Sequence, residues 1–142
     1  MPEAGKLLVA KPLLGDPNFD RTVVLLIDHN HQGSFGFVVN NPLSIRLSDL
    51  IVGFPEINNE VFSGGPVQQD NLFFIHRKGN LIPGSQEIGN GLYWGGELKP
   101  LKELIKLKLI GENDIRFYLG YSGWGANQLD MEMEEDSWLV LN

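Results

Sequence analysis

Runs of apolar residues of strand length mark the first part of the chain. Lys6–Ala10 is one such run, and Thr22–Asp28 (TVVLLID) is a continuous β-branched and aliphatic run. A run without polar alternation is typical of a strand that is covered on both faces of a sheet. Ser34–Asn40 (SFGFVVN) returns after the turn residue Gly33. The pattern therefore predicts an antiparallel hairpin in which Gly36 marks a bulge or a close backbone approach.

Proline and glycine interrupt this pattern and predict loops. Pro12–Asp20 is expected to be irregular, with Phe19 folded back onto the core or, alternatively, contacting a ligand. Pro42 ends the predicted hairpin because it donates nothing to a strand ladder. A short helix is then expected to begin at Ser48 or the residue before it and to end at Val52.

The second half of the chain predicts more strands and a clear helix. The expected strands are Val61–Phe62, Leu72–Arg77, short segments within Gly79–Gly96, Ile115–Gly120 and Trp138–Leu141. The expected helix is Lys99–Ile110, which is predicted to end at Gly111 as its C-cap. Its apolar face consists of Leu101, Leu104, Ile105, Leu109 and Ile110. With no internal repeat and no linker in the sequence, a single α+β domain over residues 1–142 is predicted.

Composition changes this picture mainly by exclusion. The 42% apolar and 20% charged fractions are those of an ordinary globular domain. The net charge of −7 disfavours direct binding to nucleic acid. The absence of cysteine removes disulfides, thiolate nucleophiles and Cys-ligated zinc. The N-terminal apolar run is too short for a signal peptide or a membrane span, so a cytoplasmic location without membrane contact is expected.

The glycine-punctuated segment Tyr121–Gly125 (YSGWG) is the strongest candidate for a site. It is predicted to be a turn between a strand and a helix over Ala126–Glu135. The first backbone N–H groups of that helix would then lack partners beside the positive end of the helix dipole, which stabilises an anion. Ser122 would add a hydroxyl and Trp124 a stacking surface. The alternative is an ordinary capped helix with Trp124 in the core.

A second glycine-rich turn is Gly64–Val67 (GGPV), between two predicted strands. Consecutive N–H groups in such a turn can bind a small anion, although the segment lacks the lysine and Ser/Thr of a phosphate loop. The alternative is a tight connection in which no side chain fits. If the two glycine-rich turns meet in space, the two signals support one site.

The serine, histidine and acidic residues give weaker signals for a catalytic or metal-binding site. Ser122 fails the serine-nucleophile pattern G-x-S-x-G because Trp124 stands where glycine is needed, even with His29 or His76 available as a partner. His29 and His31 are expected to be a solvated pair at a loop tip. His76 is expected to be a hydrogen-bonded residue at a strand end or, alternatively, part of a ligand site. The acidic residues between positions 130 and 136 are expected to be a solvated helix end.

Several motifs together resemble the AlgH/YqgE family of bacterial proteins. They are GKLLVAKPLLGDPNFDRTVVLLIDH, GSFGFVVNNPL, GGPV followed by His76, and GYSGWGANQLDMEME followed by Trp138. The resemblance covers nearly the whole chain. It implies a small barrel-like, bifurcated, mixed or antiparallel sheet surrounded by helices. Members usually continue beyond the position of Trp138, so this chain is expected to lack a family C-terminal segment that could complete the site.

The family is named for a proposed regulator of alginate synthesis, and its members are often labelled transcriptional regulators. No general enzymatic activity comes with the name. Three hypotheses follow: a small-molecule or anion-binding regulatory module, a protein-interaction adaptor, and a regulator that contacts DNA directly, which the charge and the lack of a helix-turn-helix disfavour. No catalytic residue, metal ligand or cofactor is predicted. The candidate ligand-binding residues are Asn40, Gly64, Gly65, His76, Tyr121, Ser122, Gly123, Trp124 and Gln128.

Overall fold

The computed structural model describes residues 1–11, 22–55 and 57–142. The predicted Pro12–Asp20 loop and Phe19 lie outside these residues. The strands are β1 (Leu7–Ala10), β2 (Val23–Asn30), β3 (Gly33–Val38), β4 (Pro42–Arg46), β5 (Glu60–Ser63), β6 (Val67–His76), β7 (Gln86–Gly89), β8 (Leu92–Trp94), β9 (Ile115–Trp124) and β10 (Trp138–Leu141). The helices are α1 (Leu47–Leu50), α2 (Leu98–Lys106), the 3-10 helix η1 (Glu112–Asp114) and α3 (Gln128–Glu134). The fold is thus a small, mostly antiparallel α+β domain.

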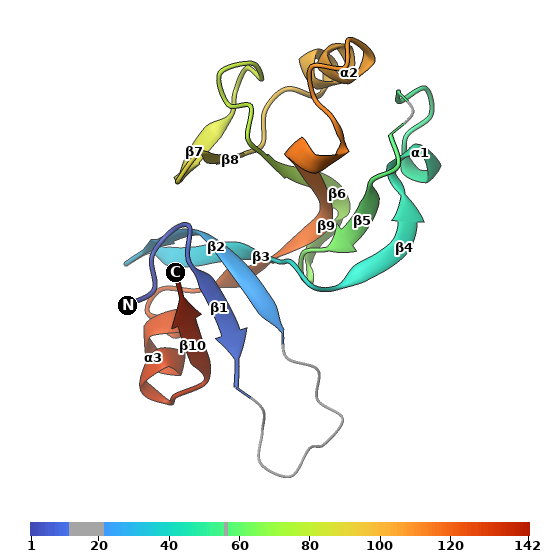
Figure 1. Ribbon diagram of the computed structural model, residues 1–142. Helices are drawn as coiled ribbons and strands as arrows, with labels where there is room; N and C mark the ends of the chain where they lie inside the picture. Colours follow the sequence, from blue (N-terminus) through green and yellow to red (C-terminus); the bar gives the residue numbers. More distant parts are fainter. Residues whose placement is uncertain (12–21, 56) are drawn as a thin grey trace.

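Strand β9 organises the sheet, because it pairs with three other strands. Its first half lies parallel to β5 and antiparallel to β6, and its last residues pair antiparallel with β3. The strand order is β10-β1-β2-β3-β9-β6-β8-β7, with β4 joined through β5 as a branch. Figure 1 shows β9 running between the part of the sheet that carries α3 and the part that carries α1 and α2.

The sheet is bifurcated but open. Strands β3 and β5 diverge from β9 at a fork formed by Val38, Gly64 and Leu119. There the Gly64 N–H donates to the Leu119 oxygen at 2.8 Å, and the Val38 N–H donates to the Gly64 oxygen at 2.9 Å. Within the described residues the terminal strands β10 and β7 are not paired with each other. The predicted closure into a barrel is therefore not confirmed.

The first hairpin forms as predicted. Strand β2 has four consecutive buried residues, Val24–Ile27, which confirms a strand covered on both faces. The register with β3 is irregular between Leu26 and Asp28, opposite Gly36. A Cβ at Gly36 would overlap the carbonyl oxygen of Leu25. Gly36 therefore marks both the bulge and the close approach that the sequence predicted.

Strand β4 and helix α2 are two of the elements that differ from the predictions. Strand β4 was not predicted because it begins at Pro42, which is tolerated there as the first residue of a strand whose described partner is β5 alone. Helix α2 ends at Lys106 rather than Ile110, since Leu107 is its C-cap and Lys108 has a φ of 60°. The prediction of Gly111 as a helix C-cap is wrong, because Gly111 instead precedes η1.

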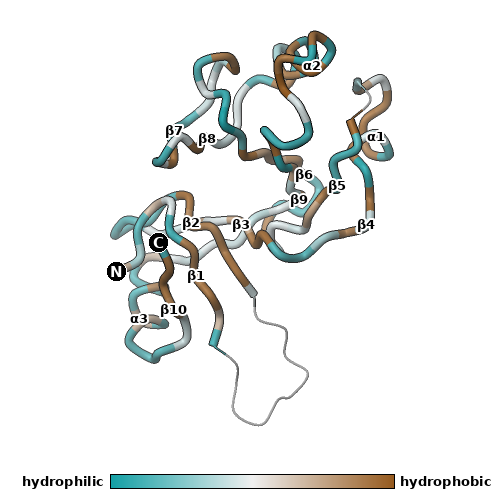
Figure 2. The backbone as a smooth tube through the Cα atoms, in the orientation of Figure 1, coloured by the Kyte–Doolittle hydropathy of each residue, from teal (hydrophilic) through white to brown (hydrophobic). Residues whose placement is uncertain are grey.

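Three apolar clusters hold the layers together. One includes Leu101 and Ile105 of α2 and packs on the β5–β6–β9 part of the sheet. Another joins Leu129 of α3 to β1 and β2, where Figure 2 shows the hydrophobic segments of β1, β2 and β10 beside that helix. The third contains Phe37 and Tyr118 and lies between these two parts. Among the helices of the described residues, none has the length and apolar character needed to cross a bilayer.

Candidate functional site

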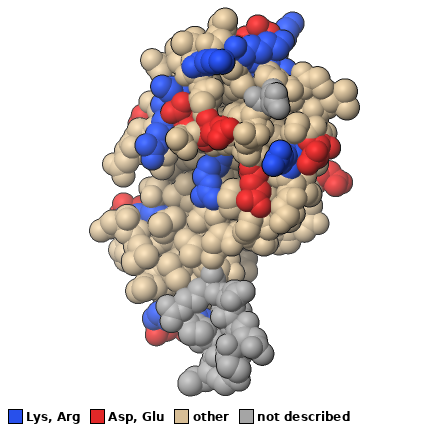
Figure 3. Space-filling model, turned by 45° about the vertical axis from the view of Figure 1, so that its right-hand side comes forward, with Lys and Arg blue, Asp and Glu red and all other residues tan. Residues whose placement is uncertain are grey.

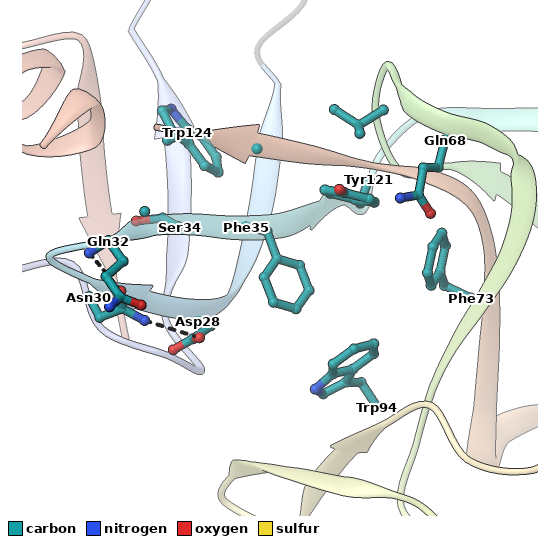
Figure 4. Close-up of a pocket in the computed structure, with 13 residues that line it drawn as sticks. Asp28, Asn30, Gln32, Ser34, Phe35, Gln68, Phe73, Trp94, Tyr121 and Trp124 are labelled. Carbon is teal, nitrogen blue, oxygen red and sulfur yellow. Dashed lines mark hydrogen bonds between the residues drawn. The ribbon is translucent and has the colours of Figure 1, made fainter. Parts of the chain in front are cut away.

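A cleft of about 680 Å³ opens beside the β2–β3 hairpin, and we call it the aromatic cleft. Strands β6, β8 and β9 supply its other walls (Figure 4). Its lining residues are Asp28, Asn30, Gln32, Gly33, Ser34, Phe35, Val67, Gln68, Phe73, Trp94, Tyr121, Gly123 and Trp124. Five of these side chains are aromatic. A cleft of this size, with mostly apolar walls and a few polar groups, is the usual form of a small-molecule site.

The aromatic wall is ordered by contacts between its own rings. The Phe35 ring lies edge-to-face against Trp94 and Tyr121, with centroid distances of 5.2 and 5.7 Å. The Phe73 ring meets Tyr121 at 5.7 Å in the same manner. Figure 4 shows these four side chains around one space, although they come from four different strands. Because the rings are mutually supported, the wall is preorganised and a ligand need not order it on binding.

The polar part of the lining is amide-rich and acidic. The Asn30 side-chain nitrogen donates to the Asp28 carboxylate at 3.3 Å, and the Gln32 N–H donates to the Asn30 side-chain oxygen at 2.8 Å. Gln68 adds a further amide across the cleft. Among the described lining residues, Asp28 alone is charged at neutral pH. This environment favours a neutral or positively charged ligand over an anion.

The predicted turn at Tyr121–Gly125 is wrong. Strand β9 continues to Trp124, with Ser122 paired to Gly36 and Gly123 to Phe35 on β3. Helix α3 begins only at Gln128, whose side-chain oxygen accepts the Gly125 N–H at 3.0 Å. The strand therefore replaces the predicted turn before the helix, and anion binding at the helix start stays a prediction. Strand pairing with β3 has overridden the local turn signal.

The two glycine-rich segments do meet, at the fork of the sheet. A Cβ at Gly64 would overlap the Gly120 oxygen, and one at Gly65 would overlap the backbone of Tyr121. The Ser122 hydroxyl donates to the Gly64 oxygen at 3.1 Å. The two segments therefore contact each other through closely packed backbone atoms. It supports the reading of Gly64–Val67 as a tight connection in which no side chain fits.

Of the sequence-predicted site residues, the aromatic cleft brings together Tyr121, Gly123 and Trp124. Gly64, Gly65 and Ser122 belong to the adjoining fork. Asn40 lies beyond the end of β3, and its side-chain oxygen accepts the Val23 N–H at 3.0 Å. Gln128 is exposed and donates to the Glu132 carboxylate at 3.1 Å. Ligand binding by these residues stays a prediction.

His76 lies outside the cleft, in the core beside β8. Only 1% of it is exposed, and its ring stacks on Tyr93. The Lys78 N–H donates to Nδ1 at 3.1 Å, so Nε2 carries the proton and faces the Gly95 oxygen and the Ser85 hydroxyl, each at 3.0 Å. These contacts correspond to the predicted hydrogen-bonded residue at a strand end. Burial lowers the pKa of His76 from its ordinary value.

A pH dependence of stability follows from His76. Below about pH 6.5 the unfolded chain binds a proton that the folded protein resists, so the stability contribution of neutral His76 is complete above that pH and is lost as the pH falls. Urea unfolding at about pH 7.5 and about pH 5.5 measures this loss. His76→Gln is expected to reduce the loss, and His31→Gln, at an exposed position, to leave it unchanged. An equal loss in wild type and His76→Gln would contradict the assignment.

Sequence reasoning missed most of the cleft. Phe35, Phe73 and Trp94 form its wall, and Asp28 and Gln68 supply polar groups. The alternation in SFGF places Phe35 on the same face as Phe37, which was a usable signal. Trp94 gave no comparable signal, because it lies in the glycine-rich stretch whose strand boundaries the sequence does not define.

The predictions for the other acids and histidines are wrong for His29 and Glu132, whereas His31, Glu134, Glu135 and Asp136 are exposed as expected. His29 is in strand β2 rather than at a solvated loop tip, with 17% of its side chain exposed and Ser34 and Asp130 as partners. Glu132 is not merely solvated. Its carboxylate accepts the indole N–H of Trp124 at 3.0 Å and that of Trp138 at 2.8 Å. In the part of the chain that the structure describes, no group of three or more His, Asp or Glu side chains could hold a metal ion.

Comparison with known proteins gives consistent matches over this fold. An AlgH-like family model matches residues 7–142. A UPF0301 protein of Chlorobium limicola is 49% identical over 134 residues, which cover 94% of this chain and 72% of that protein. A UPF0301 protein of Cytophaga hutchinsonii is 42% identical over 137 residues, covering 96% of this chain and 75% of that protein.

Two solved structures share the architecture. The solution structure of the AlgH protein from Pseudomonas aeruginosa matches with a TM-score of 0.77 and 32% identity, over 96% of this chain and 75% of that one. A crystal structure of a protein from Corynebacterium diphtheriae matches with a TM-score of 0.80 over 99% of this chain and 76% of that one. The latter is 23% identical and shows a shared fold only.

Proposed function

This chain belongs to the AlgH-like family, and we propose that it is a small-molecule-binding module whose site is the aromatic cleft. The observation that supports this most strongly is the set of four rings, from Phe35, Phe73, Trp94 and Tyr121, held edge-to-face around one open space. An apolar wall that is ordered without a ligand, with amides at its edge, suits a flat ring bearing hydrogen-bonding groups.

The charge of the lining narrows the ligand class. A small anion would meet the Asp28 carboxylate, and the described lining residues offer no lysine, arginine or histidine to offset the repulsion. A cation would gain both from that carboxylate and from the ring faces, by about 0.5–2 kcal/mol for a well-placed cation–π contact. We therefore propose a neutral or cationic ring compound and do not retain the anion in this proposal.

Direct DNA binding has little support. Figure 3 shows Lys and Arg side chains interspersed with Asp and Glu side chains, and the described residues on that face form no continuous basic surface. Together with the net charge of −7, such a distribution offers few phosphate contacts.

A matched set of probes tests the ligand class. Benzylamine, benzyl alcohol and phenyl phosphate share one aromatic ring and differ in charge. Titrations followed by the protein's NMR spectrum are expected to give binding in the order benzylamine, then benzyl alcohol, then phenyl phosphate, because Asp28 is the charged group of the lining. Tightest binding of phenyl phosphate would contradict the proposal and would support the anion-binding hypothesis.

A substitution in the wall tests its location. Trp94→Leu keeps apolar bulk but removes the ring that packs on Phe35. It is expected to weaken benzylamine binding about tenfold, since an aromatic pair contributes roughly 0.5–1.5 kcal/mol beyond its buried area. Leu107→Ala, at a position 67% exposed after α2, is the control and is expected to change nothing. Equal affinities in wild type and Trp94→Leu would place the site elsewhere.

A further inference from the structure

Three side chains from three elements form a hydrogen-bonded chain beside the aromatic cleft. The Ser34 hydroxyl on β3 lies 2.5 Å from His29 Nδ1 on β2. The other ring nitrogen, His29 Nε2, lies 3.3 Å from a carboxylate oxygen of Asp130 on α3. Ser34 and His29 are direct cross-strand partners in the hairpin, so the sheet register itself brings them together.

These contacts define the roles of the groups. When the serine hydroxyl donates to Nδ1, Nε2 carries the ring proton and donates to Asp130. A hydroxyl, an imidazole that can accept its proton, and a carboxylate that orients the ring are the parts of an activated serine nucleophile. The two ring nitrogens are exchanged relative to the Ser-His-Asp arrangement of serine proteases, but the direction of proton transfer is the same.

The Ser34 hydroxyl lies on the face of the hairpin opposite to Phe35, because successive residues of a strand point to opposite faces. Ser34 borders the aromatic cleft, but its side chain points toward His29 and α3 and not toward the aromatic wall. Ser34 is partly exposed, so a substrate would approach it from this side of the hairpin. The His29 side chain retains 17% exposure, so the base is neither sealed in the core nor fully solvated.

The other serines near histidines or glycine-rich turns lack this combination. The Ser85 hydroxyl lies 3.0 Å from His76 Nε2, but His76 is buried and its Nδ1 accepts the Lys78 backbone N–H in place of facing a carboxylate. Ser122 donates to the Gly64 carbonyl at the fork. Among the described residues, Ser34 alone combines a histidine partner with a carboxylate behind that histidine.

We propose that Ser34 is the nucleophile of an esterase site, with His29 as its general base and Asp130 as the residue that positions His29. The substrate class is a carboxylic ester that reaches Ser34 from the face of the hairpin that carries His29. The inference does not depend on the ligand proposed above, because it rests on the Ser34–His29–Asp130 geometry.

The reaction balances with water as the sole co-reactant. Ser34 Oγ forms a bond to the ester carbonyl carbon while its proton passes to His29 Nδ1. The C–O bond of the ester then breaks, and the leaving alcohol takes that proton. Water attacks the acyl-serine, gives a proton to His29, and the serine oxygen leaves with it, which releases the carboxylic acid. The Asp130 carboxylate stabilises the imidazolium that forms in each half.

Active-site labelling of the whole chain tests the nucleophile. A fluorophosphonate probe is expected to modify Ser34, identified by peptide mass spectrometry, and Ser34→Ala is expected to abolish the labelling. Ser48→Ala, an exposed serine on α1, is the control and is expected to label as wild type does. Absence of modification at Ser34 in the folded wild-type protein, or modification at another serine alone, would overturn the proposal.

Hydrolysis of p-nitrophenyl phenylacetate tests the other two residues. His29→Gln is expected to lower kcat by about 100-fold or more, the usual range for loss of a general base. Asp130→Asn is expected to lower kcat with little change in KM, and Asp130→Glu to restore part of it, because a positioning carboxylate acts on the base and not on the substrate. Equal kcat in wild type and His29→Gln would contradict the assignment. If the protein bound benzylamine but did not hydrolyse the ester, the esterase proposal would be overturned and the ligand-binding proposal would stand.

Discussion

Replacing Gly64 with alanine is expected to lower the free energy of unfolding by about 3 kcal/mol or more. The added Cβ would overlap the Gly120 carbonyl oxygen and press on the Phe37 ring. The backbone of Gly64 cannot shift away from this overlap, because it is hydrogen-bonded to both Leu119 and Val38. The Phe37 ring cannot shift either, because it is fully buried against Tyr118. Strain would therefore spread along β3, β5 and β9 together.

Gly111→Ala provides the matched control for this substitution. Gly111 has an ordinary negative φ of −108°, and its added Cβ would find its nearest neighbour at 3.8 Å. Its effect in urea unfolding is expected to stay within about 0.5 kcal/mol. If Gly64→Ala were as mild as Gly111→Ala, the fork would not be the rigid junction described here.

Replacing Glu132 with alanine is expected to cost about 3 kcal/mol. One oxygen of this carboxylate accepts the indole N–H groups of both Trp124 and Trp138, and so ties β9 and β10 to α3. Removing it leaves two half-buried donors without their acceptor, at roughly 1–3 kcal/mol for each buried one. Urea unfolding followed by tryptophan fluorescence reports both the stability and the change around the two indoles.

Glu134→Ala, on the exposed side of the same helix, is the control and is expected to change stability by no more than about 0.5 kcal/mol. Glu132→Gln keeps one acceptor oxygen and is expected to fall between the two. Equal stabilities of the Glu132→Ala and Glu134→Ala variants would show that the tryptophan contacts contribute nothing.

The predicted parts of the fold are those that local patterns specify. The continuous apolar run at Val24–Ile27 indicated a buried strand, and the turn after it with Gly36 indicated the hairpin. The family motifs indicated the bifurcated α+β architecture, which the three partners of β9 display. For the buried strand and the hairpin, residues near in sequence carry enough information to define the element, whereas the bifurcation was implied only by the family resemblance.

The features that were predicted wrongly, or not at all, depend on pairing between strands that are distant in sequence. The segment Tyr121–Trp124 has the composition of a turn, yet it extends β9 because β3 offers it a complementary edge. The aromatic cleft could not be predicted for the same reason. Phe35, Trp94 and Tyr121 lie on three strands whose adjacency follows from the strand order, and no short motif records that order.

The indole N–H signals in a ¹H–¹⁵N spectrum test the central claim most directly. The chain has three tryptophans, of which Trp94 and Trp124 line the aromatic cleft and Trp138 does not. Titration with benzylamine is expected to shift the Trp94 signal in a saturable manner, while the Trp138 signal, held by Glu132, stays in place. No shift of Trp94, or an equal shift of Trp138, would contradict a ligand site in the aromatic cleft.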